Sequence, residues 1–395
     1  MANAVIIDVV RTPGGKRNGS LSGWHPVELA ATTLNALIER AGVDPGLIDD
    51  VILGCVDQVG RQALNVARNA VLSAGWPESV PATTIDRQCG SAQQAAHFAA
   101  QGVLAGAYDL VVAGGVEVMS TTPMGANMVP GVSPFGAVLE GRYEPAGGLV
   151  PQGISAELIA ERWCLTRDDL DTFAAESQRR AAEARDAGRF ANEIIPVAGI
   201  KWDQEKGTPV GQGTTITADE GIRAGTTAEV LGNLKPAFLP DGVVTAGNSS
   251  QITDGASAML IASEETANRL GLRPRARFHT FALAGDDPRF MLTAPIPATA
   301  KVLERAGLAL DDIDLVEINE AFASVVLAWQ IEHKADLDKV NVNGGAIALG
   351  HPLGATGVKL FATLLNELER RDGRYGLLTM CEGGGMANAT IIERL

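Results

Sequence analysis

The stretch LIERAGVDPGLIDDVILGCV, residues 37–56, has a counterpart in VLERAGLALDDIDLVEINEA, residues 302–321. Both contain Glu-Arg-Ala-Gly, at 39–42 and at 304–307, and an Ile-Asp pair follows after the same number of residues. Each copy has the pattern of a helix that ends at a glycine, then an acidic turn, then a buried strand. The shared pattern indicates a chain built from two similar halves.

A second match supports the duplication. YDLVVAGGVE (108–117) parallels YGLLTMCEGG (375–384), since each is an apolar strand that enters a glycine-rich turn. Between the matches we expect two strand–turn–helix units, around Cys89-Gly90-Ser91 and Leu353-Gly354-Ala355. Strands that alternate with helices predict mostly parallel sheets covered by helices, with ligands beyond the carboxyl ends of the strands. We therefore predict two α/β halves about a pseudo-two-fold axis, with one shared site.

The segment 119–248 has no counterpart in the repeat. It opens with TTPMGANMVPGVSPFG, and it includes the helical stretch SAELIAERW and a second helix that Thr166 and Asp169 begin as a capping box. The stretch QITDGASAMLIAS (251–263) reads as a core strand that rejoins the first half. We expect an N-terminal half of residues 1–118 plus 249–271, an inserted loop domain of residues 119–248, and a C-terminal half of residues 272–395.

Composition limits the possible functions. A formal net charge of −15 argues against nucleic acid or an anionic membrane as the main partner. No apolar stretch approaches the ~20 residues of a membrane span, and the N-terminus reads as a strand rather than a signal peptide. The four cysteines have neither zinc-site spacing nor the density of a disulfide scaffold. We expect a cytoplasmic protein of a reducing compartment.

Cys89 lies in TIDRQCGSAQQA, residues 84–95, between an extended β-branched stretch and an alanine-rich buried helix. The amides at a helix N-terminus stabilise a thiolate and lower the pKa of a thiol. Gly90 would let the backbone approach a ligand closely. These features favour a nucleophile; the alternative is a buried packing residue.

A cysteine nucleophile needs a base, usually a histidine. His97 falls inside the buried helix and reads as a core residue, whereas His351 lies in the glycine-crowded stretch NVNGGAIALGHPLGATG, which we interpret as a second strand-to-helix junction. A dinucleotide phosphate loop is the alternative there, but the glycine spacing does not match it. Asn319 and Cys381 each end an apolar strand, where a turn residue and a packing residue are the alternatives.

DRQCGSAQQA, EINEAFAS, NVNGGAIALGHPLGATG and CEGGG, in this order, resemble the motifs of the thiolases, the acetyl-CoA C-acyltransferases. The resemblance covers essentially the whole chain and is closest to bacterial β-oxidation-type members. It implies duplicated halves in a five-layer α-β-α-β-α sandwich with an inserted loop domain, assembled as a homodimer or homotetramer.

The resemblance also implies a reaction: thiolysis of 3-ketoacyl-CoA by coenzyme A to acetyl-CoA and a shortened acyl-CoA, or the reverse Claisen condensation. Cys89 would carry the acyl group in a ping-pong mechanism, His351 would take its proton, and Cys381 would handle the α-carbon proton. His351 with a water held by Asn319 would stabilise one thioester oxygen, and the backbone N–H groups of Cys89 and Gly383 the other. Coenzyme A and acyl-CoA would be substrates, with no metal and no permanently bound cofactor.

Coenzyme A carries phosphates, for which the resemblance implies Arg223 in the insertion, and it implies Ser250 as a pantetheine contact. The sequence departs from the family pattern at three places. Pro151-Gln152 stands where a Met-Gly pair is common, Glu382 follows Cys381 where a small or apolar residue is usual, and Ala387 replaces a glycine. A carboxylate at 382 would raise the pKa of Cys381 if it pointed inward.

Four alternatives remain beside a broad 3-ketoacyl-CoA thiolase. The chain could be an acetoacetyl-CoA-specific acetyl-CoA acetyltransferase or a thiolase of steroid-derived substrates. A decarboxylating condensing enzyme would share the fold, but it has no use for the second thiol of Cys381. A non-catalytic acyl-CoA-binding protein would not need Cys89, His351 and Cys381 together.

Overall fold

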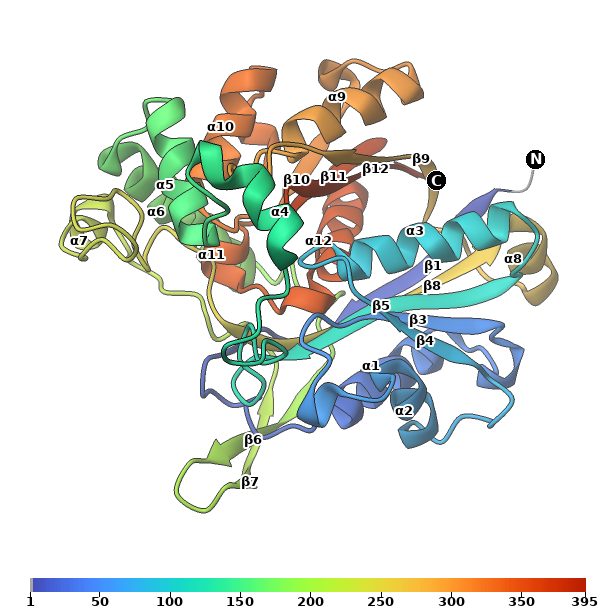
Figure 1. Cartoon of the computed structure of the whole chain (residues 1–395). Helices are drawn as coiled ribbons and strands as arrows, with labels where there is room; N and C mark the ends of the chain where they lie inside the picture. Colours follow the sequence, from blue (N-terminus) through green and yellow to red (C-terminus); the bar gives the residue numbers. More distant parts are fainter. Residues whose placement is uncertain (1–2) are drawn as a thin grey trace.

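The computed structural model of the chain describes residues 3–395 (Figure 1). Ten of its strands form one mixed sheet that divides into two halves of matching design, and two strands of the insertion form a separate small sheet. In the N-terminal half the strands lie in the order β4 (Ala82–Ile85), β3 (Asp50–Gly54), β5 (Leu110–Val118), β8 (Thr253–Ser263) and β1 (Ala4–Arg11), and the short β2 (Gly15–Lys16) pairs with β8. In the C-terminal half the order is β10 (Leu315–Ile318), β11 (Tyr375–Glu382), β12 (Met386–Arg394) and β9 (Ala276–Gly285).

The two halves repeat the same sequence of strand directions. β3 runs parallel to β4 and β5, and β5, β8 and β1 then alternate in direction. In the C-terminal half β10 runs parallel to β11, and on its other side it forms a single parallel bridge with Val340. β11, β12 and β9 then alternate in direction. The halves meet where β1 pairs with β9 through Val5 and Ile6. The predicted duplication is confirmed.

The expectation of mostly parallel sheets is wrong, because five of the eight pairings along the path are antiparallel. The tight turn Gly383–Gly385 between β11 and β12 requires an antiparallel pair, since a parallel connection needs a long crossover. Within the N-terminal half β8 returns between β1 and β5 after the insertion, antiparallel to both.

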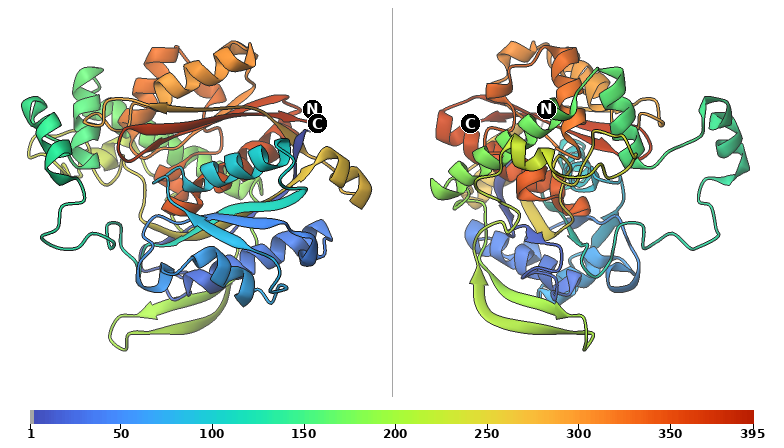
Figure 2. Two further views of the ribbon diagram at one scale, coloured as in Figure 1. Left: turned by 45° about the vertical axis from the view of Figure 1, so that its right-hand side comes forward. Right: turned by 90° about the vertical axis from the view of Figure 1, so that its left-hand side faces the viewer.

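Helices form three layers around these strands (Figures 1 and 2). Two helices lie between the halves, where they pack against each other and against the strands. Other helices cover the outer face of each half. The central helices are α3 (Ser91–Leu104) and α12 (Thr356–Arg371); α1 (Pro26–Ala41) and α2 (Val66–Ser73) cover the N-terminal half, α8 (Glu264–Leu270) follows β8, and α9 (Pro295–Ala306) and α10 (Ala323–His333) cover the C-terminal half. The result is the five-layer α-β-α-β-α sandwich.

The two copies of the repeated sequence, residues 37–56 and 302–321, fold in the same way. Gly42 and Gly307 both end a helix in the left-handed conformation, with φ of +66°, where a side chain would be strained. A 3₁₀ turn follows in each half, η1 (Pro45–Leu47) and η4 (Leu310–Asp312), before β3 and β10.

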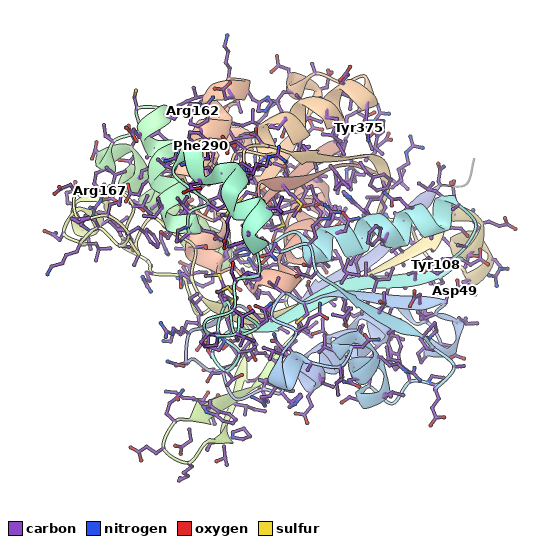
Figure 3. All side chains as sticks on the ribbon, in the orientation of Figure 1. Asp49, Tyr108, Arg162, Arg167, Phe290 and Tyr375 are labelled. Carbon is purple, nitrogen blue, oxygen red and sulfur yellow. The ribbon has the colours of Figure 1, made fainter. Side chains whose placement is uncertain are left out.

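The duplication extends to side-chain hydrogen bonds. One carboxylate oxygen of Asp49 accepts two successive backbone N–H groups at the start of β5, the second from Leu110 at 2.9 Å. Asp314 does the same at the start of β11, the second from Tyr375 at 2.9 Å. Figure 3, which labels Asp49 and Tyr375, places the two features in separate halves.

The insertion between β5 and β8 packs mainly against the C-terminal half. Its helices α5 (Gln152–Arg162) and α6 (Arg167–Asp186) contact α10. The guanidinium of Arg162, at the end of α5, lies 4.9 Å from the ring centre of Phe290 (Figure 3). The predicted capping box of Thr166 and Asp169 begins α6. The elements are α4 (Gly136–Tyr143), α5 (Gln152–Arg162), α6 (Arg167–Asp186), β6 (Val197–Asp203), β7 (Thr208–Ile216) and α7 (Ala228–Gly232). The β6–β7 hairpin and α4 stand away from the body of the molecule (Figure 2).

Among residues 3–395 no helix has the length and apolar character that crossing a bilayer requires.

Candidate active site

Cys89 lies in the short loop between β4 and α3. Gly90 is the N-cap residue of α3, and the hydroxyl of Ser91 accepts the N–H of Arg87 and donates to the carbonyl of Gln88 at 2.6 Å. Gln88 has a left-handed backbone with φ of +49°. These bonds fix a compact turn that presents Cys89 at the start of the central helix, and 5% of its surface is exposed.

The expectation that the helix N-terminus lowers the pKa of Cys89 is wrong for this structure. Burial, and to a smaller extent the nearby carboxylate of Glu382, raises the pKa of Cys89 to about 12. The dipole of α3 is too small to offset the loss of hydration around a buried thiolate. The thiol is therefore protonated at neutral pH and needs a base to become a nucleophile.

His351 has one defined ring orientation and tautomer. Its Nδ1 lies 2.6 Å from Oγ1 of Thr356, and that hydroxyl donates its own proton to the carbonyl oxygen of Pro352 at 2.8 Å. The hydroxyl must therefore accept from Nδ1–H, which leaves Nε2 unprotonated. Burial lowers the pKa of His351 to about 3, and Lys359 lowers it too, so the ring is neutral and can accept a proton at Nε2.

The His351 loop is not the strand-to-helix junction that we expected. The short helix α11 (Ala346–Leu349) precedes it, and the 3₁₀ turn η6 (Leu353–Ala355) leads into α12. The glycines at 344 and 350, both with positive φ, allow this compact path where a strand would need extended backbone.

Three side chains hold the backbone of this loop. The hydroxyl of Thr253 accepts the N–H of His351 at 3.0 Å, and the ammonium of Lys359 donates to the carbonyl of Gly350 at 3.2 Å. Glu117 on β5 accepts the N–H of Gly354 at 2.9 Å, and it also accepts backbone N–H groups of the loop after β3. The loop is thus anchored to both halves of the molecule.

Asn319 follows β10 and faces His351. Its Nδ2 lies 3.5 Å from Nε2 of His351, and its Oδ1 is buried without a hydrogen-bond partner among the described residues. The next residue, Glu320, turns away and binds the hydroxyl of Ser177 and the amide of Asn341. Asn319 therefore faces the imidazole with a free amide oxygen, while Glu320 braces the turn.

The end of β11 approaches the Cys89 loop. Burial raises the pKa of Cys381 well above its usual value, and negative charge on Cys89 or Glu382 raises it too. A Cβ added to Gly383 would lie 3.0 Å from Oε1 of Gln88, the residue before Cys89. Gln88 and Gly90, the chain neighbours of Cys89, thus lie beside Gly383 and Glu382, which follow Cys381.

The structure shows where the three departures from the family pattern lie. The side chain of Glu382 points inward, is fully buried and lies over Gly90. Gly90 therefore makes room for this carboxyl group. Ala387 is buried and pairs with Cys381 across the β11–β12 hairpin, and Pro151 is the N-cap residue of α5.

Arg223 and Ser250 flank the site. The backbone N–H of Arg223 donates to the amide oxygen of Gln178 at 2.7 Å, and the side chain of Arg223 is exposed. Ser250 is half-buried, and its N–H donates to the carbonyl of Ala321 at 2.9 Å, two residues after Asn319. Ser250 therefore lies beside the Asn319 turn, and Arg223 lies beside Gln178, which in turn donates to the carbonyl of Ile347 on α11.

Sequence reasoning correctly assigned His97 to the core. It is fully buried on α3, and its ring nitrogens lie 2.6 Å from the hydroxyl of Thr390 and 3.3 Å from the amide of Asn388. The same reasoning missed Thr356, Thr253 and Glu117, which hold the His351 loop. Of these three, only Thr356 could have been found from the sequence, because it begins a helix five residues after His351, whose backbone is restricted by the following Pro352.

Comparison with known proteins gives a consistent result. Residues 4–265 match the family described as "Thiolase, N-terminal domain", and residues 272–394 match "Thiolase, C-terminal domain". A steroid 3-ketoacyl-CoA thiolase of Mycobacterium tuberculosis is 51% identical over 100% of this chain and 95% of its own length. A 3-ketoacyl-CoA thiolase of Bacillus subtilis is 44% identical over 100% of both chains. The crystal structure of the Bacillus anthracis acetyl-CoA acetyltransferase superposes with a TM-score of 0.89 at 40% identity, covering 100% of this chain and 99% of that one.

Proposed function

Because the chain belongs to the thiolase family and is an acyltransferase of coenzyme A thioesters, we propose that Cys89, His351 and Cys381 carry out its reaction. The observation that carries this proposal is the fixed tautomer of His351, which presents a neutral Nε2 beside Asn319 in a site with two interacting thiols. A neutral imidazole and two protonated thiols form a resting state from which acid–base and nucleophilic catalysis on a thioester can begin.

The first half-reaction cleaves the carbon chain. Nε2 of His351 takes the proton of Cys89, whose sulfur attacks the 3-keto carbon, and the bond between C2 and C3 breaks. Cys381 gives its proton to the acetyl-CoA carbanion that leaves. The products are acetyl-CoA and an acyl group on Cys89, with an imidazolium and a Cys381 thiolate in the site.

The second half-reaction closes the proton balance. The Cys381 thiolate takes the proton of the incoming coenzyme A thiol, whose sulfur attacks the acyl carbon on Cys89. The Cys89 thiolate leaves and recovers its proton from His351. Each group returns to its starting protonation state, and the reverse sequence is the Claisen condensation.

Negative charge on the reacting oxygens needs fixed donors. We assign one oxygen to His351 and a water held by Asn319, whose unpaired amide oxygen is available for that water. We assign the other to the backbone N–H groups of Cys89 and Gly383, because Gly383 lies beside the side chain of Gln88, the residue before Cys89. Loss of one such donor costs roughly 3–4 kcal/mol of transition-state stabilisation.

For the substrate we propose 3-ketoacyl-CoA longer than acetoacetyl-CoA. Two of the similar proteins are named for 3-ketoacyl-CoA, one of them for steroid substrates, and Pro151-Gln152 replaces the usual pair at the start of α5. Arg223 is the candidate partner of the coenzyme A phosphates and Ser250 the candidate contact of its pantetheine arm. Homodimeric or homotetrameric assembly and a cytoplasmic location belong to the same proposal.

A thiolysis assay tests the proposal. Purified protein is mixed with coenzyme A and, in separate reactions, acetoacetyl-CoA, a longer linear 3-ketoacyl-CoA and a steroid-derived 3-ketoacyl-CoA, with Cys89→Ala as control. We expect the wild-type protein to consume the longer substrates and the Cys89→Ala control to consume none of them. Cleavage of acetoacetyl-CoA alone would overturn the substrate assignment, and full activity of Cys89→Ala would overturn the mechanism.

A further inference from the structure

Glu382 is a buried carboxyl group that the mechanism above does not use. Its side chain is fully buried, and neither carboxylate oxygen has a hydrogen-bond partner among residues 3–395. Buried carboxyl groups are normally paired or hydrogen-bonded, because leaving one unpaired costs free energy. A group in this position calls for an explanation beyond packing.

The surroundings of Glu382 place it beside both thiols. It is the next residue after Cys381 on β11, and its carboxyl group fills the space over Gly90, the next residue after Cys89. A Cβ on Gly90 would overlap with Oε1 of Glu382. Glu382 is therefore next to Cys381 in the chain, and its carboxyl group is next to Gly90, the chain neighbour of Cys89, in space.

Other charges near this position do not neutralise it. Arg87 lies on the same side, but its guanidinium does not reach either oxygen at hydrogen-bond distance, and its side-chain contact is with the sulfur of Met386 at 4.0 Å. The titratable and charged groups around Glu382 and the two thiols are Asp86, Arg87, Cys89, His97, Glu117 and Cys381, together with His351, the base assigned to Cys89. The β12 residues opposite, Met386 to Asn388, are neutral.

We propose that Glu382 controls the ionisation of both thiols: while its carboxyl group is protonated the thiolates can form, and when it ionises it holds Cys89 and Cys381 as thiols. The physical basis is repulsion between like charges in a site with little water. Glu382 acts through the thiols and does not itself touch the substrate. Its place in thiolysis rests on the function proposed above; its effect on the thiols does not.

The direction of the effect with pH follows from the carboxyl group. Burial raises the pKa of Glu382 to about 8, and the charge of Arg87 and the nearby backbone N–H of Asn388, which does not reach hydrogen-bond geometry, only partly oppose this. Below that pH the group is neutral and equivalent to glutamine, so Glu382→Gln changes nothing. Above it the wild-type carboxylate is charged, and the variant then forms thiolates more readily. A merely structural effect of the substitution would not depend on pH in this way.

The test is the rate of alkylation of each thiol by iodoacetamide, read peptide by peptide by mass spectrometry on the intact protein from about pH 6.5 to about pH 9.5. Site resolution is necessary because Cys164 is also free, and it is exposed. We expect the ratio of rates at Cys89 between Glu382→Gln and wild type to be near one at low pH and to rise to about tenfold at high pH, the effect of about one pKa unit. Cys381 should follow.

Two further variants make the result specific. Glu382→Asp keeps the charge and should remain close to wild type at every pH. Glu317→Gln removes another fully buried carboxylate with an unpaired oxygen, on β10, and should leave the ratio near one throughout. A ratio for Glu382→Gln that does not change with pH would overturn the proposal. Alkylation requires no turnover, so failure of the thiolysis assay would leave this test intact.

Discussion

Oγ1 of Thr356 accepts the Nδ1–H of His351 at 2.6 Å while it donates to the carbonyl of Pro352. The single hydroxyl thus determines which imidazole nitrogen is free. Because Thr356 is the first residue of α12, the position of the central helix and the protonation of the base are set together.

Thr356→Val should lower kcat for thiolysis by about 10–100-fold. The substitution keeps the shape but removes the acceptor of Nδ1–H, and leaving a buried donor unsatisfied costs about 1–3 kcal/mol. Steady-state kinetics on a 3-ketoacyl-CoA would measure it, with KM nearly constant. Thr356→Ser keeps the hydroxyl and serves as control. Equal kcat in the valine variant and wild type would show that the hydroxyl does not orient the base.

Gly90→Ala should destabilise the fold by about 1–3 kcal/mol, because the added Cβ overlaps with the carboxyl group of Glu382. Chemical denaturation of the variant would measure this loss. In the double variant Gly90→Ala/Glu382→Ala the overlap is gone, so the two effects should be less than additive. Strict additivity would mean that the two side chains do not meet.

Arg11→Met should lower the free energy of unfolding by about 3–5 kcal/mol. Arg11 is fully buried and binds Glu193 at 2.7 Å and Asp219 at 2.7 and 3.0 Å, and its loss leaves two buried carboxylates without their cation. Arg179→Met on α6 breaks only exposed ion pairs and should cost below about 1 kcal/mol. Urea unfolding of both variants provides the comparison, and equal losses would contradict it.

His97 should make stability depend on pH. Burial lowers the pKa of His97 to about 3 from 6.5, so the unfolded chain binds a proton below pH 6.5 that the folded protein does not. The free energy of unfolding therefore falls as pH drops from 6.5 toward 3, by up to ~1.4 kcal/mol per pH unit from this group.

His97→Gln removes this contribution. Its unfolding free energy, measured between about pH 6 and pH 4.5, should fall less steeply than that of wild type. Parallel slopes for the two proteins would show that His97 is not kept neutral by burial. His351 has a lowered pKa for the same reason and contributes equally to both slopes.

Local sequence was sufficient wherever a residue's own neighbours determine its structure. The glycine caps at Gly42 and Gly307, the Thr166 capping box and the core position of His97 follow from short-range chemistry, and all are found. The duplication could be predicted because the sequence itself repeats.

Long-range features could not be read in the same way. Strand direction in β8 depends on where the chain returns after a long insertion, which no local pattern encodes. The raised pKa of Cys89 depends on burial under β11 and on Glu382, almost 300 residues away in sequence. The inward orientation of Glu382 likewise depends on the missing side chain of Gly90.

The repeated strand directions of the two halves restrict how this kind of chemistry can be encoded. In an assembly of two identical halves, whatever residue stands in the loop before the central helix of one half stands there in the other. A thiol before α3 and an imidazole before α12 are therefore a broken symmetry. Linking the halves in one polypeptide lets each loop carry a different residue, so the covalent connection between them is itself a condition for pairing a nucleophile with a base.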